Sequence, residues 1–129
     1  MLLDTHVLLW FLDDSPRLGA EARRRLSSAD QPLVSAASLW ELAIKLALGK
    51  VATPDDLPRH IAAAGLGTIA VTAAHAWSSR AVLGLPHRDP FDRLLVTQAA
   101  AERLPFLTAD RALLASEILP RVELVDARS

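Results

Sequence analysis

Short apolar segments alternate with longer segments of helical spacing along the whole chain. The apolar segments predict strands at residues 1–3, 32–35, 68–71, 105–108 and 122–125. The other segments predict helices at residues 5–12, 18–28, 38–48, 54–64, 72–83, 90–103 and 110–116. Because short apolar strands separated by helices are typical of strands buried on both faces, this order predicts a parallel sheet with helices on both sides. The expected fold class is α/β.

Length and composition indicate a single domain spanning residues 1–129. A chain of 129 residues is about one domain's worth, and a hydrophobic content of 51% excludes a wholly disordered chain. Cysteine is absent, which excludes a disulfide framework, a thiolate zinc site and a cysteine nucleophile. The formal net charge of -1 argues against a protein that coats nucleic acid without regard to sequence.

The apolar stretches do not read as a leader or a membrane anchor. Residues 1–14 lack a basic region and include Asp4, unlike a signal peptide. The longest stretch without Asp, Glu, Lys or Arg, residues 61–79, contains Gly65 and Gly67, which predict a helix end and a turn into a strand. We therefore expect a cytoplasmic protein that does not enter a membrane. A mean hydropathy of +0.24 predicts that a partner or a second copy covers some apolar surface.

Four acidic residues from distant segments are predicted to meet at one edge of the sheet. Asp4 ends the first strand, and Glu41 lies in the opening turn of the helix that leaves the second. Asp92 lies in the first turn of the helix that leads into the strand at residues 105–108, and Asp110 follows that strand. In parallel sheets flanked by helices, functional side chains gather outside the carboxyl ends of the strands. We therefore expect these four carboxylates to line one site.

Each of the four acids also has a purely structural interpretation. Asp4 and Asp110 have the position of helix N-caps, and Glu41 completes a capping box that begins at Ser38. Asp92 is an acid in the first turn of a helix that Asp89 caps. Capping does not require all four acids to share one edge, and a capping residue can also serve a site, so both interpretations stay open.

The predicted acidic cluster points to a metal site. Clustered carboxylates repel each other unless a cation compensates their charge. An all-oxygen acidic pocket without cysteine or histidine suits a hard cation such as Mg²⁺ or Mn²⁺, which keeps several waters and meets substrate phosphates. Such an ion activates water and stabilises the charge that develops during phosphodiester hydrolysis. The spacing therefore predicts metal-dependent phosphoryl chemistry and does not name the substrate.

Four segments of the chain resemble the motifs of PIN-domain proteins. They are LLDTHVLLW at residues 2–10, SAASLWELAIK at residues 35–45, HRDPFDRLL at residues 87–95 and LTAD at residues 107–110. Their order and spacing fit over essentially the whole chain, and they are most similar to toxin ribonucleases of the VapC type, from bacterial VapBC toxin–antitoxin pairs. The resemblance implies a three-layer α/β/α PIN-like domain.

The resemblance also implies an activity and its partners. It implies an endoribonuclease toxin that depends on Mg²⁺ or Mn²⁺ and cleaves RNA phosphodiester bonds with a metal-activated water. It implies a cognate antitoxin that inhibits the enzyme, and a homodimer or a toxin–antitoxin hetero-oligomer. By the motif match, the metal and catalytic positions are Asp4, Glu41, Asp92 and Asp110. Supporting positions are Thr5, Thr108 and Asp89, the last of which is read first as a helix cap.

Some assignments have competing interpretations. Arg88 and Arg93 flank the third motif and are candidates for binding RNA phosphates, but arginines here could equally pair with nearby carboxylates. Among the histidines, only His87, beside the same motif, is a candidate worth testing. The alternative to an enzyme is a catalytically silent PIN-like binding module that acts through its antitoxin and operator complex.

Overall fold

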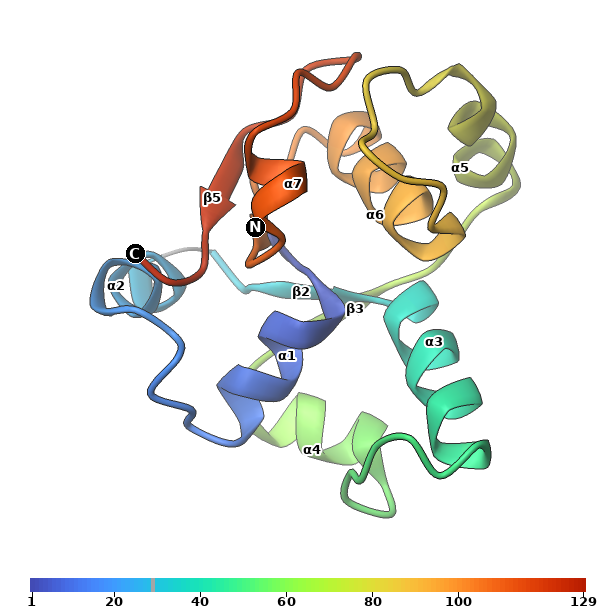
Figure 1. Ribbon diagram of the computed structural model, residues 1–129. Helices are drawn as coiled ribbons and strands as arrows, with labels where there is room; N and C mark the ends of the chain where they lie inside the picture. Colours follow the sequence, from blue (N-terminus) through green and yellow to red (C-terminus); the bar gives the residue numbers. More distant parts are fainter. Residues whose placement is uncertain (29) are drawn as a thin grey trace.

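The computed structural model describes residues 1–28 and 30–129 (Figure 1). In this part of the chain the strands form one parallel sheet in the order β3-β2-β1-β4-β5. The strands are β1 (Leu2–Leu3), β2 (Leu33–Ser35), β3 (Gly67–Ile69), β4 (Phe106–Thr108) and β5 (Leu124–Asp126). The predicted strands are thus confirmed, although each is shorter than predicted and β3 and β5 are also shifted by one or two residues, and the sheet is parallel throughout.

Helices cover both faces of this sheet. They are α1 (Thr5–Leu12), α2 (Ala20–Ser28), α3 (Ala36–Ala47), α4 (Leu57–Ala63), α5 (Ala73–Ser78), η1 (Ser79–Ala81), α6 (Pro90–Ala101) and α7 (Arg111–Leu114). Residues of α1, α2 and α4 pack in one core, and residues of α6 and α7 pack in a second core. The molecule is therefore the expected three-layer α/β/α fold (Figure 1).

The apolar strands feed both cores because successive side chains of a strand point to opposite faces. Leu2 and Phe106 lie in the core beside α6, whereas Leu3 and Leu107 lie in the core beside α1. All four side chains are fully buried. The central strands β1 and β4 are hydrophobic at every one of these positions for this reason, and polar residues appear only where the strands end.

Several predicted helix ends are wrong. The helix expected at residues 54–64 begins only at Leu57. Asp56 precedes it without a side-chain cap, and the Thr53 hydroxyl donates to the carbonyl of Pro54. The helix expected at residues 72–83 ends as an α-helix at Ser78 and continues as the 3₁₀ turn η1. The capping box expected at Ser38 is also wrong, since Ser35 caps α3 by accepting the N–H of Ala37.

The uncharged stretch at residues 61–79 is divided among several elements. It contains the end of α4, the strand β3 and the helix α5. Gly65 has a φ of 81°, a left-handed conformation that favours glycine, and it ends α4 as predicted. Within residues 1–28 and 30–129, no helix is long and apolar enough to cross a membrane.

Leu107→Ala is expected to destabilise the protein by about 2–5 kcal/mol, because it opens a cavity beneath α1 in a core that cannot fully collapse. The matched control is Leu48→Ala, since the Leu48 side chain is 62% exposed at the end of α3. We expect the control to change the free energy of unfolding by less than about 1 kcal/mol. Urea denaturation of both variants measures the difference. Equal losses would contradict the assignment of Leu107 to the core.

Candidate metal centre

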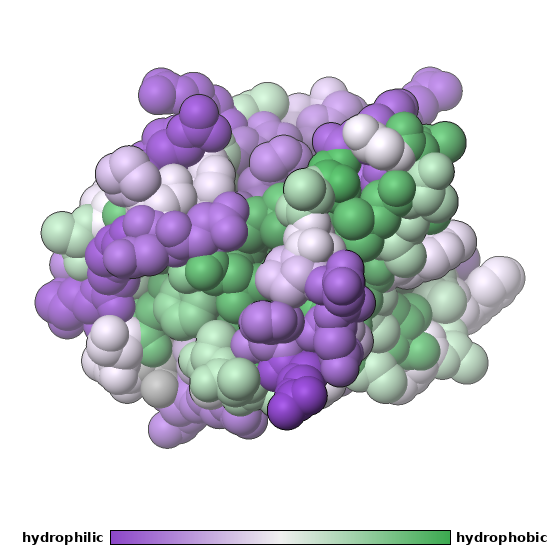
Figure 2. All heavy atoms as spheres, turned by 90° about the horizontal axis from the view of Figure 1, so that it is seen from below, coloured by the Kyte–Doolittle hydropathy of each residue, from purple (hydrophilic) through white to green (hydrophobic). Residues whose placement is uncertain are grey.

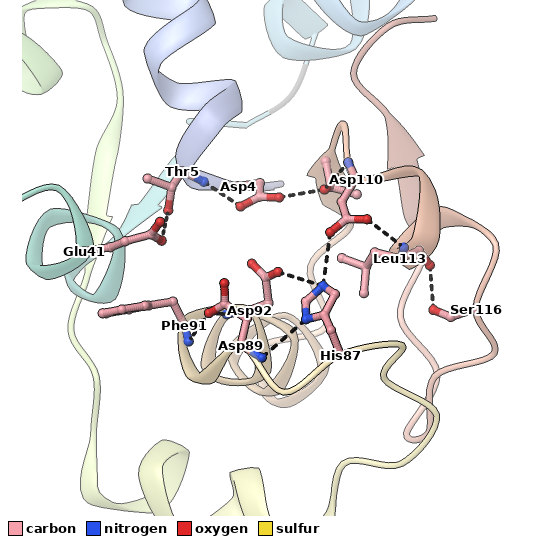
Figure 3. Close-up of polar contacts among 11 residues, drawn as sticks. Asp4, Thr5, Glu41, His87, Asp89, Phe91, Asp92, Asp110, Leu113 and Ser116 are labelled. Atoms are coloured by element: carbon pink, nitrogen blue, oxygen red, sulfur yellow. Dashed lines mark hydrogen bonds and ion pairs between the residues drawn. The ribbon is translucent and has the colours of Figure 1, made fainter. Parts of the chain in front are cut away.

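A cavity of about 420 Å³ opens at the carboxyl edge of the sheet. The four predicted acids Asp4, Glu41, Asp92 and Asp110 all line it, together with Asp89. They come from the end of β1, from α3, from the N-terminus of α6 and from the end of β4, and they face one another across the cavity (Figure 3). The predicted convergence of the four acids is therefore observed.

Asp4 is both a helix cap and a buried member of the cluster. Its Oδ1 accepts the N–H of Thr5 at 2.7 Å, and its Oδ2 accepts the hydroxyl of Thr108 at 2.6 Å. Burial raises the pKa of the Asp4 carboxyl, and the hydrogen bond from Thr108 opposes that rise. Thr108 also accepts the N–H of Asp110 at 3.1 Å, so one hydroxyl fixes two acids. Asp4 therefore caps α1 and lies in the acidic cluster at the same time.

Glu41 is held from two sides. Its Oε1 accepts the hydroxyl of Thr5 at 2.9 Å, and its Oε2 accepts Lys45 Nζ at 2.7 Å. Thr5 Oγ1 also lies 2.9 Å from Ser38 Oγ. Since α3 begins at Ala36, Ser38 and Glu41 lie further into the helix than predicted, and the same face of α3 presents both to α1. The hydrogen bonds from Thr5 to Ser38 and Glu41 therefore link α1 to α3, whereas the sequence predicted a capping box within α3.

Asp89 and Asp92 have different environments although they share one helix turn. Asp89 is exposed, and its Oδ1 accepts the N–H of Phe91 at 2.8 Å and that of Asp92 at 3.3 Å, as the cap interpretation predicts. The Asp92 side chain is 14% exposed. Burial, and then the negative charges of Asp4 and Asp89, raise the pKa of Asp92 to about 7. Asp92 is therefore the acid whose negative charge is least compensated.

His87 joins the acids from the loop before α6. Its Nε2 lies 3.1 Å from Asp110 Oδ2 and 3.2 Å from Asp92 Oδ2 (Figure 3). Asp110 also caps α7, since its Oδ1 accepts the N–H of Leu113 at 3.0 Å. Burial acts to raise the pKa of Asp110, but the hydrogen bonds from Leu113 and His87 together hold it below its usual value. His87 is not among the predicted site residues, although its place beside the third motif made it the one histidine considered worth testing.

The two predicted RNA-binding arginines differ in what they contact. Arg93 donates to the backbone carbonyls of Ser79 at 2.7 Å and Val82 at 3.1 Å, and so ties α6 to η1. These partners are carbonyls, whereas the structural alternative expected carboxylates. Arg88 is exposed beside the cavity.

Five further residues line the cavity but were not predicted as site residues from the sequence. They are His6, Trp10, Lys45, Ala109 and Arg128. Arg128 donates to the carbonyl of Ala109, and its guanidinium carbon lies 5.5 Å from the centre of the Trp10 ring. The four-residue spacing of His6 and Trp10 on one helix face was a usable signal. Arg128 carries no local signal, since only the return of the chain after β5 brings it to the cavity.

The residues of this cavity fit a hard divalent cation. Carboxylate oxygens are the donors that Mg²⁺ and Mn²⁺ take in proteins. His87, Asp92 and Asp110 each offer a ligand atom, and these atoms lie within 4.8 Å of one another. Lys45 compensates the charge of Glu41, and the raised pKa of Asp92 indicates that the remaining charge is not fully compensated. A bound cation would supply that missing positive charge.

The fold and the site together define a class: three-layer α/β/α proteins with an acidic cavity at the carboxyl edge of a parallel sheet. Residues 1–117 match the PIN domain family. The chain belongs to that family. It is also 32% identical over 120 residues to Ribonuclease VapC22 of Mycobacterium tuberculosis, a match that covers 88% of each chain.

Solved structures share the fold at low sequence identity. VapBC2 from Rickettsia felis, bound to a DNA fragment of its promoter, has a TM-score of 0.68 at 16% identity, covering 97% of this chain and 96% of that chain. A toxin–antitoxin complex from Klebsiella pneumoniae has a TM-score of 0.62 at 19% identity, covering 96% and 94%. DNA-bound VapBC from Salmonella typhimurium has a TM-score of 0.62 at 18% identity, covering 97% and 96%.

Proposed function

We propose that this protein is a metal-dependent endoribonuclease and the toxin of a toxin–antitoxin pair. The observation that carries the proposal is the convergence of Asp4, Glu41, Asp92 and Asp110 in one cavity. The similarity of the chain to Ribonuclease VapC22 supports RNA as the substrate. Asp4, Glu41 and Asp110 are each held in the cavity by hydrogen bonds, and this support for the acidic cluster favours an enzyme over a catalytically silent module.

The four acids would hold Mg²⁺ or Mn²⁺, directly or through water. When bound, the cation would supply Lewis acidity, activating water as the nucleophile and offsetting the charge that develops on the phosphodiester. Thr5 and Thr108 orient Glu41 and Asp4 by hydrogen bonds and so restrict the positions of their carboxylate oxygens. Such pre-organisation lowers the cost of binding, because the ligands lose little freedom when the cation arrives.

The RNA backbone would approach from the open side of the cavity. Arg88 is exposed between His87 and Asp89, which line the cavity, and it is the stronger candidate for a phosphate contact, since Arg93 is already bonded to two carbonyls. Lys45 and Arg128 are cations in the cavity wall and would also attract phosphate. Few cationic side chains and a net charge of -1 fit an enzyme selective for its RNA better than a general RNA binder.

The partner we propose is a protein antitoxin, within a homodimer or a toxin–antitoxin hetero-oligomer. Similar structures are described as toxin–antitoxin and VapBC complexes. Large apolar side chains are exposed, among them Trp40, Leu48 and Trp77 at 63%, 62% and 70%. Figure 2 shows hydrophobic surface, in green, between hydrophilic residues, in purple, on the face seen from below Figure 1. Apolar surface of this kind is typical of a protein that associates with others.

The test is to incubate the purified, antitoxin-free protein with total bacterial RNA in Mn²⁺ or in EDTA, with Asp4→Ala alongside. The RNA ends are mapped by sequencing, because a selective enzyme can ignore an arbitrary oligonucleotide. We expect discrete cuts that require the cation and vanish in Asp4→Ala. A folded protein that binds Mn²⁺ and makes no cuts would favour the silent module instead.

A further inference from the structure

His87 occupies an unusual place for a histidine beside an acidic site. Its Nε2 lies between two carboxylates, 3.1 Å from Asp110 Oδ2 and 3.2 Å from Asp92 Oδ2. Its Nδ1 accepts the N–H of Asp89 at 3.4 Å. A neutral imidazole in this arrangement carries its proton on Nε2, which therefore donates to the two carboxylates. This N–H places the positive end of a bond dipole between the carboxylates of Asp92 and Asp110.

The side chains of His87, Asp92 and Asp110 also have the arrangement of ligands around one metal ion. The ligand atoms of His87, Asp92 and Asp110 lie within 4.8 Å of one another, so one ion between them can reach all three. The His87 side chain is 33% exposed and lines the cavity, so an ion that enters the cavity can approach it. His6 also lines the cavity, but it is not part of this group of three.

We propose that His87 Nε2 is a ligand of the divalent cation together with Asp92 and Asp110, so that the centre is a mixed nitrogen–oxygen site that prefers Mn²⁺ to Mg²⁺. The inference rests on the proposed metal-dependent function and goes beyond it by naming a nitrogen ligand and a preferred metal. Imidazole nitrogen binds Mn²⁺ better than Mg²⁺, whose ligands in proteins are nearly all oxygens. Metal binding would require the other tautomer of the neutral imidazole: Nε2 gives its proton to solvent, Nδ1 takes up a proton in its place and gives up the 3.4 Å contact from the Asp89 N–H, and the Nε2 lone pair then binds the metal.

The direct test is pulsed electron paramagnetic resonance of the Mn²⁺-loaded full chain. We expect a hyperfine coupling from a directly coordinated nitrogen, which changes when histidine is labelled with ¹⁵N. The coupling should vanish in His87→Gln and persist in His6→Gln, the matched control in the same cavity. Because the wild-type spectrum alone reports a coordinated nitrogen, the test does not depend on the folding of a variant.

Calorimetric titration with each metal provides the second readout. We expect the wild type to bind Mn²⁺ at least about tenfold more tightly than Mg²⁺. His87→Gln should weaken Mn²⁺ binding by at least about tenfold and change Mg²⁺ binding by less than about threefold, so that the preference is largely lost. His6→Gln should leave both dissociation constants within about twofold of the wild type, since it removes no ligand.

The outcomes separate this inference from the proposed function. Bound Mn²⁺ without a coordinated nitrogen would mean that His87 only bridges the two acids, and the inference would be overturned while metal-dependent activity stood. A folded protein that binds neither metal would overturn both. A preference for Mn²⁺ that survives in His87→Gln would assign the preference to the carboxylates and contradict the role of His87.

Discussion

Asp92→Asn is expected to lower the rate of metal-dependent RNA cleavage by at least about 10³-fold, equivalent to about 4 kcal/mol of transition-state stabilisation. The negative charges of Asp4, Asp89 and Asp110 all act on Asp92, and its Oδ2 lies 3.2 Å from His87 Nε2. Asparagine keeps the shape of the side chain but removes its negative charge and one strong ligand oxygen. Time courses of cleavage at the mapped RNA sites in Mn²⁺ measure the loss.

Asp89→Asn is the matched control, since it makes the same chemical change three residues earlier. The Asp89 carboxyl accepts two backbone N–H groups at the start of α6, and an asparagine oxygen can accept them equally well. We therefore expect cleavage within about tenfold of the wild-type rate. If Asp89→Asn were as inactive as Asp92→Asn, Asp89 would belong to the metal site in addition to capping the helix.

Without metal, Asp92→Asn is expected to be more stable than the wild type above about pH 7 and equally stable near pH 4. The pKa of Asp92 is raised to about 7 in the folded protein, compared with an ordinary aspartate value near 4 when unfolded. Between these values the folded state binds more protons than the unfolded state, so the wild-type free energy of unfolding falls as pH rises. Asparagine does not titrate and lacks this loss.

The size of that difference is set by how far solvent screens a partly exposed group. We expect about 2 kcal/mol above pH 7, less than the full pKa shift implies, and a melting temperature several degrees higher for the variant. Melting curves in EDTA over the whole pH range measure it. A wild type that gained stability with rising pH relative to Asp92→Asn would contradict the raised pKa.

Adding Mn²⁺ should reverse the order of the two proteins at neutral pH. A ligand that binds only the folded state stabilises it by an amount that grows with the logarithm of its concentration relative to its Kd, and the wild type keeps the acid that the variant has lost. The melting temperature of the wild type should therefore rise with Mn²⁺ concentration, while that of Asp92→Asn changes little. An equal rise in both would mean that the ion binds away from Asp92.

Local signals predicted much of the fold and of the site. The short apolar strands followed by polar residues, and the Asp-Pro start of α6, depend on chemistry within a few residues, and the structure has them in place. The caps at Asp4, Asp89 and Asp110 are likewise present, because a side-chain oxygen next to free backbone N–H groups needs no distant partner. The same local reasoning failed for residues 54–64 and for Ser38.

The failure at Ser38 has a tertiary cause. Ser35 is the buried last residue of β2, and its hydroxyl accepts the N–H of Ala37 and donates to the buried Gln98 side chain of α6, so the cap of α3 lies three residues before the predicted cap Ser38. Ser38 is drawn instead to Thr5, which lies 33 residues away in sequence. A capping pattern reports only that a cap is available, and competing contacts from other elements decide whether it forms.

The sequence by itself determined that strands and helices alternate, that the strands are buried on both faces, and which acids stand where strands end and helices begin. Those properties follow from the period of apolar residues and from caps, which act over a few residues. Only the tertiary structure decided the strand order, the place of His87 between Asp92 and Asp110, and the approach of Arg128 to the cavity. These features depend on how segments that are far apart in the sequence pack against one another. Such packing is the sum of many weak contacts, and none of these contacts leaves a local pattern in the sequence.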